Sequence, residues 1–372
     1  MTKVRDVIEV MESWAPSSLA ETWDNVGLIT GEVDHAISSV MITLDVTVET
    51  IAQARKNHVA LIITHHPPIM KPLKNLTGEQ MSSRAICMAI REDISIYTSH
   101  TNLDRAPEGV SATLAHKLGL TSVSPLSQDM NGLIKFVVFT PPEYTDRVRE
   151  AAGSAGAGII GNYNLCSFTS RGLGTYIPSS VSQPYEGEAG KLSRVPEDRI
   201  EMIVHAPFIA HVIEETRKVH PYEEMAYDLI PLSNPETSFG YGAIGNLQQP
   251  MEHTYFPEYV SRILNVKSLT VSEGKGNLIK RIGVMGGSGK SYIQHAVKSG
   301  ADAYITGDLG YHDYMEYGRC ILLIDASHRA TELPVLDKIQ ERLLTSGIGE
   351  KIDIILDAGK VVTTMFDSNT LP

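Results

Sequence analysis

Histidine and carboxylate side chains follow several apolar segments of the sequence, where they could bind metal ions. His65 and His66 end the run LIITHH, which two prolines follow. His328 and Glu332 stand four residues apart in IDASHRATE, so a helix that begins there would place both side chains on one face. Asp104 follows the run SIYTSH. Imidazole and carboxylate groups without thiolates are ligands that many divalent metals accept.

The elements that position these residues follow an alternating pattern of strands and helices. Strands are expected at residues 38–46, 61–66 and 95–100, with helical patterns between them. After residue 240 the alternation resumes, with strands at residues 301–308 and 320–328. This order predicts βαβ units and a mainly parallel sheet. In such sheets functional residues gather at the carboxyl ends of the strands, where the candidate ligands stand.

The number of candidate ligands favours two metal ions over one. A tetrahedral site with one open position needs three protein ligands, whereas five are available here. Two ions a few ångströms apart, bridged by a carboxylate and a water, would use all five. The same residues also have plainer interpretations: His328 and Glu332 as a solvated helical pair, and Asp104 as a helix cap. The candidate metal ligands are His65, His66, Asp104, His328 and Glu332.

Three further residues could orient these ligands or transfer protons. His100 ends the run SIYTSH, and Asp308 and His312 stand four apart after the strand expected at 301–308. Taken alone, Asp308 would be a helix cap and His312 a surface histidine.

The segment GVMGGSGKSY looks like a nucleotide-binding loop but departs from that motif. A Walker A loop needs glycine five residues before the glycine that precedes the lysine, and Val284 stands there. A tight turn from a strand into a helix remains.

The composition narrows the functional class. With 32 Lys+Arg against 44 Asp+Glu, the net charge is −12, which argues against a general nucleic-acid binder. Cys87, Cys166 and Cys320 form no CxxC pair, so they are expected to be free and buried. The N-terminus lacks the apolar core of a signal peptide, and no apolar run is long enough to span a bilayer. We therefore expect a cytoplasmic protein without membrane contact.

The middle of the chain has a different pattern. A strand and a helix precede a Gly/Ser/Pro-rich stretch, and a strand, a helix and a strand follow, which predicts a ferredoxin-like insert. The expected fold is a discontinuous α/β domain of two similar halves with an inserted α+β domain. Its expected bounds are residues 1–131 and 241–372 for the halves and 132–240 for the insert.

Five motifs are distributed over most of the sequence: WDNVGLITGE, LIITHHPPI, YTSHTNLDRAPEGV, YITGDLGYHD and IDASHRATE. Together they resemble the Nif-three-like dinuclear-metal family, whose bacterial members are called GTP cyclohydrolase I type II homologs. The segment VHPYEEMAYDLIPL resembles the PII/CutA-like insert of the longer members. The resemblance implies the same five metal ligands and a homohexamer built as a ring of trimers. Sites made of histidines and carboxylates accept Zn, Fe, Mn, Ni or Co, so two divalent ions from this group are expected. It also implies hydrolytic opening of the imidazole ring of GTP.

One departure from the family pattern lies beside the candidate ligands. Family members carry glycine before and an aromatic residue after the second histidine, whereas this sequence has Ser327 and Arg329. Arg329 could add a cation that binds phosphate. Two functions remain open: a metal-dependent hydrolase acting on a nucleotide, phosphoester or other small anionic substrate, or a non-enzymatic, metal-handling or regulatory oligomer whose insert binds a ligand or partner.

Overall fold

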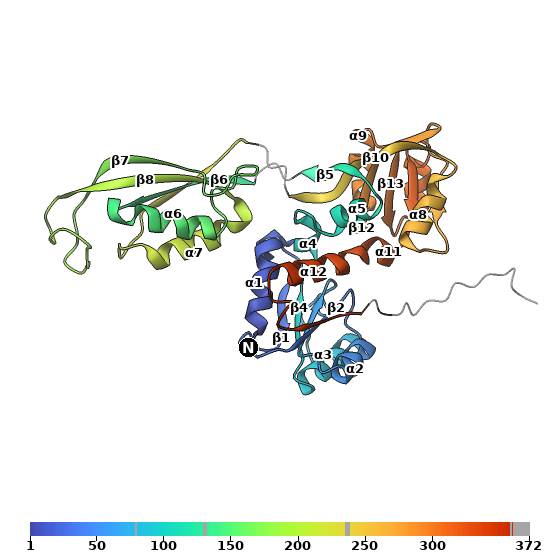
Figure 1. The fold of residues 1–372 in the computed structure, drawn as a ribbon, viewed down its shortest axis with the longest axis horizontal. Coiled ribbons are helices and arrows are strands. Elements are labelled where there is room, and N and C mark those ends of the chain that lie inside the picture. Colours follow the sequence, from blue (N-terminus) through green and yellow to red (C-terminus); the bar gives the residue numbers. More distant parts are fainter. Residues whose placement is uncertain (79, 129–131, 235–238, 358, 360–372) are drawn as a thin grey trace, which may run out of the picture. The chain divides into compact units, whose positions relative to one another are not determined.

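The chain folds into two compact units, one inserted in the other. The computed structural model describes residues 1–78, 80–128, 132–234, 239–357 and 359. Residues 1–128 and 238–372 form the larger unit, and residues 129–237 form the insert. The sequence pattern placed the bounds of the insert at residues 132 and 240. The predicted mixed α/β fold is confirmed (Figure 1).

The first sheet of the larger unit has the strand order β1-β4-β3-β2-β15. Strands β15, β2, β3 and β4 are parallel, and β1 is antiparallel to β4. Every residue of β3 is buried, as expected of a parallel strand covered on both faces. The elements of this lobe are α1 (Val4–Trp14), β1 (Gly27–Thr30), β2 (Ser39–Thr43), α2 (Val48–Lys56), β3 (Leu61–Thr64), α3 (Met81–Arg91), β4 (Ser95–Thr98), α12 (Pro334–Thr345) and β15 (Asp353–Asp357).

The second sheet has the order β11-β14-β13-β12-β10-β5. Its central strands β12, β13 and β14 are parallel, whereas β10, β5 and β11 are antiparallel to their neighbours. The elements of this lobe are α4 (Thr101–Arg105), α5 (Val110–Lys117), β5 (Thr121–Gln128), β10 (Gly240–Glu252), α8 (Phe256–Leu264), β11 (Thr270–Val271), β12 (Leu278–Ser288), α9 (Ile293–Lys298), β13 (Ala303–Gly307), α10 (Tyr311–Tyr317), β14 (Leu322–Asp325) and α11 (His328–Glu332).

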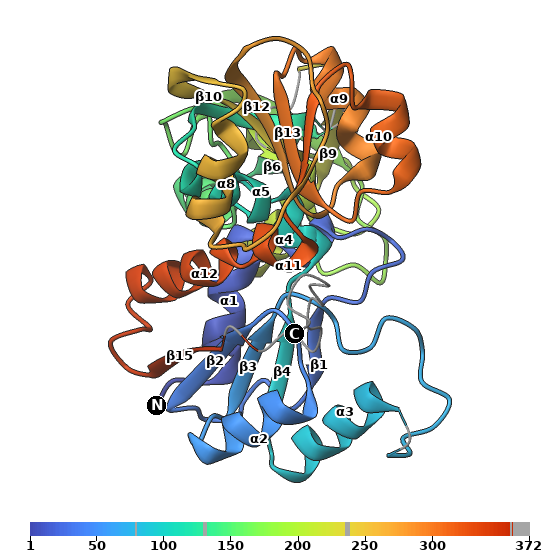
Figure 2. The same cartoon turned by 90° about the vertical axis from the view of Figure 1, so that its right-hand side faces the viewer.

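Each sheet takes one strand from the other half of the sequence. β5 precedes the insert but pairs with β10, and the C-terminal β15 pairs with β2. The two lobes are therefore linked by strands that cross in both directions. Figure 2 shows α4 and α11 between the two sheets, so the candidate ligands on these helices lie where the lobes meet.

Apolar side chains fix the helices on the sheets. Ile51 and Ala54 of α2 and Ile86 of α3 pack on the first sheet against Ile62. α5 and α8 cover one face of the second sheet, where Phe256 is among the buried side chains. Burial of a large apolar side chain contributes about 1.5–3 kcal/mol, so these contacts set the position of each strand end.

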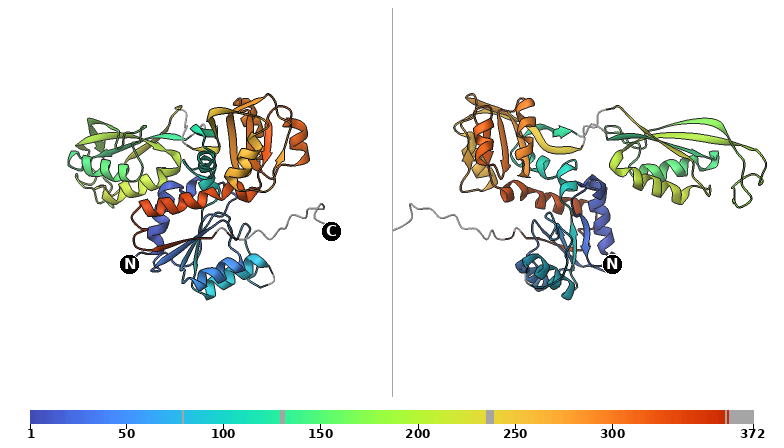
Figure 3. Two further views of the ribbon diagram at one scale, coloured as in Figure 1. Left: turned by 45° about the vertical axis from the view of Figure 1, so that its right-hand side comes forward. Right: turned by 180° about the vertical axis from the view of Figure 1, so that it is seen from behind.

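The insert has the ferredoxin-like strand order β7-β8-β6-β9 with all pairs antiparallel. Both of its helices lie on one face of the sheet (Figure 1; Figure 3 gives two further views). The Gly/Ser/Pro-rich stretch is partly regular, because the edge strand β7 runs through it. The elements of the insert are β6 (Leu133–Thr140), α6 (Thr145–Ser154), β7 (Ser167–Tyr176), β8 (Ser193–His205), α7 (Ile209–Val219) and β9 (Tyr227–Pro231).

Two expectations about the whole chain can be compared with the structure. Within the described residues, no helix combines the length and the apolar character that a bilayer span requires. Cys87, Cys166 and Cys320 are free, as predicted, but Cys320 is exposed and the other two are only partly buried. The expectation that all three are buried is therefore wrong: Cys87 lies on α3 with a partly exposed side chain, Cys166 directly precedes β7, and Cys320 lies in the turn between α10 and β14.

Candidate metal centre

His65 and His66 follow β3 directly and face the junction of the two lobes. Each imidazole is held by its Nδ1 atom: His65 Nδ1 lies 2.9 Å from the Ser99 carbonyl oxygen, and His66 Nδ1 lies 2.8 Å from Asp45 Oδ1. These contacts leave the Nε2 atom of each ring directed toward the junction of the two lobes. Such an arrangement is typical of metal-binding histidines, because the outer contact fixes the tautomer and the ring orientation.

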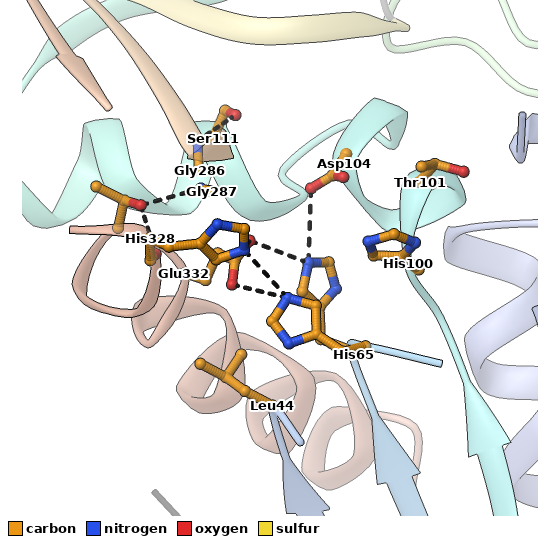
Figure 4. A network of polar contacts seen from close by, with 12 residues as sticks. Leu44, His65, His100, Thr101, Asp104, Ser111, Gly286, Gly287, His328 and Glu332 are labelled. Atoms are coloured by element: carbon orange, nitrogen blue, oxygen red, sulfur yellow. Dashed lines mark hydrogen bonds and ion pairs between the residues drawn. The ribbon is translucent and has the colours of Figure 1, made fainter. Parts of the chain in front are cut away.

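α11 supplies the matching pair from the second lobe. His328 and Glu332 lie on one face of the helix, with His328 Nε2 3.0 Å from Glu332 Oε1. His328 Nδ1 is held by Asp308 Oδ2 at 2.7 Å, in the same way that Asp45 holds His66. Figure 4 shows His65, His328 and Glu332 turned toward one another from β3 and α11.

His100 belongs to the same cluster of imidazoles. Its ring centroid lies 5.2 Å from that of His65 and 5.8 Å from that of His66. Asp24 holds its Nδ1 atom at 3.0 Å and also accepts a hydrogen bond from the Thr101 backbone N–H at 3.0 Å. The exposed ring of Trp23 lies edge-on to His100, at 6.4 Å between centroids.

The ligand atoms form two groups that share His66. One group is His65, His66 and His100, the other is His66, His328 and Glu332, and within each group the atoms lie within 4.8 Å of one another. Asp104 lies beside the first group, with Oδ1 3.8 Å from His65 Nε2. The described residues thus contain buried, histidine-rich clusters that are consistent with metal binding.

His65 shows most directly that a ligand is expected here. Its Nε2 atom is buried and has no hydrogen-bond partner in the described part of the chain. Oxygen atoms of Asp104 and Glu332 lie 3.8 and 3.7 Å away, too far for a hydrogen bond. An unpaired buried polar atom costs about 1–3 kcal/mol, so the donor set fits a cation better than it fits the bare protein.

The protonation states of the side chains in the cluster depend on one another. Burial would raise the pKa of Glu332, but the neighbouring imidazoles of His328, His65 and His66 hold it well below its usual value. Burial lowers the pKa of His66, but Asp45 and Glu332 outweigh this and raise it to about 10. The Glu332 contact likewise raises the pKa of His328 to about 9. The cluster therefore favours positive charge, which protons or metal ions can supply.

A glycine in β12 makes room for the central carboxylate. A Cβ atom on Gly287 would lie 2.3 Å from Glu332 Oε1 and 3.2 Å from His328 Nε2, and φ at this glycine is +64°. The Gly287 N–H donates to Thr331 Oγ1 at 3.0 Å, which holds α11 against the strand. The glycine-rich segment that resembled a nucleotide loop thus serves as the wall of the cluster.

Comparison with known proteins identifies the family. The profile described as Duf34/NIF3 (NGG1p interacting factor 3) matches residues 2–356. The chain belongs to the Duf34/NIF3 family. Its relatives include the GTP cyclohydrolase 1 type 2 homolog of Bacillus subtilis (strain 168), which is 35% identical over 98% of this chain and 96% of the relative. The protein of the same name from Halalkalibacterium halodurans is 37% identical over 98% of this chain and 95% of its own length.

Solved structures of the family agree in fold. The Bacillus cereus protein related to NIF3 has a TM-score of 0.80 and 36% identity, covering 98% of this chain and 99% of that one. Staphylococcus aureus protein SA1388 has a TM-score of 0.71 and 28% identity over 98% of this chain and 99% of its own. Both similarities extend over the insert as well as the larger unit.

The residues that flank His328 each have a structural consequence. The backbone of Ser327 has φ 70° and ψ 147°, a conformation that favours glycine. Its hydroxyl oxygen accepts a weak hydrogen bond from the Ala330 N–H at 3.4 Å and so caps α11. Arg329 lies 3.7 Å from Asp45 Oδ2, so its charge faces the carboxylate that holds His66.

The structure brings together seven of the eight residues singled out in the sequence. His65, His66, Asp104, His328 and Glu332 converge, His100 lies among the imidazoles, and Asp308 holds His328. His312 is the exception: it is exposed on α10 and its ring contacts Tyr311 at 5.3 Å between centroids. Sequence reasoning did not assign Asp24 and Asp45, although Asp24 lies in the WDNVGL motif and Asp45 ends an expected strand.

Proposed function

We propose that this protein is a dinuclear metal-dependent hydrolase and that its centre lies at the junction of the two lobes. The observation that supports this most directly is the convergence of Nε2 atoms on one carboxylate. His66 and His328 approach Glu332 at 3.1 and 3.0 Å while their Nδ1 atoms are held from outside. The proposed metal ligands are His65, His66, Asp104, His328 and Glu332.

Two divalent ions would supply a water of lowered pKa and a Lewis acid for the bond that is cleaved. The side chains of the protein then have distinct tasks. Asp45 and Asp308 keep the imidazoles in the tautomer that can bind a cation. Asp24 orients His100, which is the nearest candidate for holding or transferring a proton at its Nε2 atom.

For the substrate we propose a nucleotide or another phosphate ester. The relatives carry the name GTP cyclohydrolase 1 type 2 homolog, which makes hydrolytic opening of the GTP imidazole ring the first reaction to test. With a net charge of −12, the surface as a whole does not attract an anionic substrate. The metal ions must therefore supply the local positive charge that binds it. We also propose the homohexamer that the family resemblance implies, which light scattering of the purified protein tests.

The test compares metal content and turnover in matched variants. The purified protein is analysed for Zn, Fe, Mn, Ni and Co, reloaded with the metal found, and assayed on GTP and on an aryl phosphate. Ring opening is followed by the loss of guanine absorbance. We expect His66→Ala to lose both metal and turnover, whereas His211→Ala, which removes an exposed histidine of α7, keeps both. Full turnover in a metal-free His66→Ala variant would overturn the proposal, and metal binding without turnover on any substrate would favour the non-enzymatic role.

A further inference from the structure

The insert contains a pocket of about 370 Å³ that is separate from the proposed metal centre. The end of β7, the loop that leads to β8, and the segment between α7 and β9 form its walls. The volume lies in the range of small-molecule sites. The side chains that decide its chemistry are three tyrosines and three glutamates: Tyr176, Tyr185, Tyr222, Glu197, Glu223 and Glu224.

The tyrosine rings form a partial cage. The centroids of Tyr185 and Tyr222 lie 6.0 Å apart, with the rings at 44°. Tyr144, which does not line the pocket itself, supports Tyr185 from outside at 5.9 Å and 89°. Tyr222 is fixed at both ends, because its O–H donates to Glu197 Oε1 at 2.9 Å and its backbone N–H donates to His220 Nδ1 at 3.2 Å. The pocket therefore has preformed aromatic walls.

The charge of the pocket is negative. Among its described lining residues none is Lys, Arg or His, whereas three are glutamates. A glycine in β7 gives one of these carboxylates its place, since a Cβ atom on Gly174 would lie 2.1 Å from Glu197 Oε2. The nearby His220 adds no charge, because its Nδ1 accepts a hydrogen bond and its Nε2 lies 2.9 Å from the Phe139 carbonyl oxygen.

From these features we infer that the pocket binds an alkylammonium cation of about the size of choline. Aromatic faces attract such a cation, and the glutamates supply the counter-charge. A nucleotide would meet three carboxylates and no cation. A bare divalent metal would find ring faces where it needs oxygen ligands on all sides.

The test uses a charged ligand and its neutral analogue on the intact protein. Choline is titrated by calorimetry against 3,3-dimethylbutan-1-ol, which has the same shape without the charge. We expect saturable binding of choline and about tenfold weaker binding of the alcohol. Two further arms identify the source of the cation: tighter binding of a trimethyllysine peptide would indicate a protein side chain, and equal or weaker binding would indicate a free small molecule.

Variants show whether the cage is responsible. Tyr185→Leu removes the ring of a residue that is 47% exposed, and it should weaken choline binding about tenfold. Tyr222→Phe keeps the ring and should have a smaller effect, and Tyr163→Leu, at an exposed tyrosine outside the pocket, should have none. If Tyr185→Leu does not fold, Glu197→Gln and the neutral analogue on the native chain decide the question. Equal binding of the alcohol and choline, or no saturable binding of any of these cations, would overturn the inference.

Discussion

His66 Nε2 lies 3.3 Å from His328 Nε2, although 262 residues separate the two histidines in the chain. The surrounding carboxylates raise the pKa of both histidines and so favour a proton on each Nε2 atom. Two N–H groups, however, cannot point at one another favourably. A divalent cation removes this conflict because it replaces both protons. The contact is thus a reason to expect that metal binding stabilises the junction of the two lobes.

The carboxylates behind these histidines should control metal affinity. Asp45→Asn or Asp308→Asn removes the charge that holds an imidazole Nδ1, so we expect metal affinity to fall by about 10–100-fold while the fold is kept. Competition with a chelator measures the affinity. Asp34→Asn is the control, because Asp34 is exposed and pairs with Lys3 and Arg5. Unchanged affinity in both centre variants would show that the outer contacts do not orient the rings.

Gly287 should be required by the space around Glu332. In Gly287→Ala the new methyl group would displace the carboxylate, so we expect at least about tenfold weaker metal binding. Gly300→Ala is a matched control: its φ of +71° imposes the same backbone strain, but a Cβ atom there has no heavy atom within 4 Å. Equal metal affinities in the two variants would mean that strain, and not the contact with Glu332, causes the effect.

Ser327 should store backbone strain. Ser327→Gly removes the Cβ atom at φ 70°, and a Gly cap costs only a few tenths of a kcal/mol, so we expect a gain of about 1 kcal/mol and a higher melting temperature. Ser346→Gly is the comparison, because Ser346 has an unstrained φ of −75°; this substitution should lower the melting temperature. The same response at both positions would contradict the assignment of strain to Ser327.

The stability of the insert should depend on a buried carboxylate. The Arg171 hydrogen bond holds the pKa of Asp198 below its usual value, with a second hydrogen bond from Thr145 Oγ1 at 2.7 Å. At a pH above the unfolded pKa of about 3.9, the lowered pKa of Asp198 stabilises the folded form. This stabilisation is lost as the pH falls through the pKa of Asp198 in the folded form. We expect Asp198→Asn to destabilise the insert by about 1–3 kcal/mol at pH 7 and by less below pH 4.

Hydrogen exchange of the β7 and β8 amides measures this change within the insert alone. Asp146→Asn serves as the comparison, because the exposed pair of Asp146 and Arg149 should contribute less than about 1 kcal/mol. Exchange that is equally fast in both variants at pH 7 would argue against a structural role for Asp198.

The sequence predicted the residues that local geometry determines. Spacing alone identified the adjacent histidines at a strand end. It also identified the histidine and the glutamate that stand four residues apart on a helix. Asp24 is different: it holds His100 across 76 residues, and only the packed fold shows that the two meet. His312 had the same spacing from Asp308 as Glu332 has from His328, but α10 turns it to solvent, because spacing alone does not say which face of a helix packs inward.

The pairing of β15 with β2 has a consequence for how the protein is made. During synthesis β2, β3 and β4 emerge early, but the first sheet lacks its last strand until residue 357 has been translated. The proposed centre likewise remains open until Glu332 has left the ribosome. His65 and His66 must therefore wait for His328 and Glu332 until α11 has been made, so metal can be captured in its final coordination only after that point.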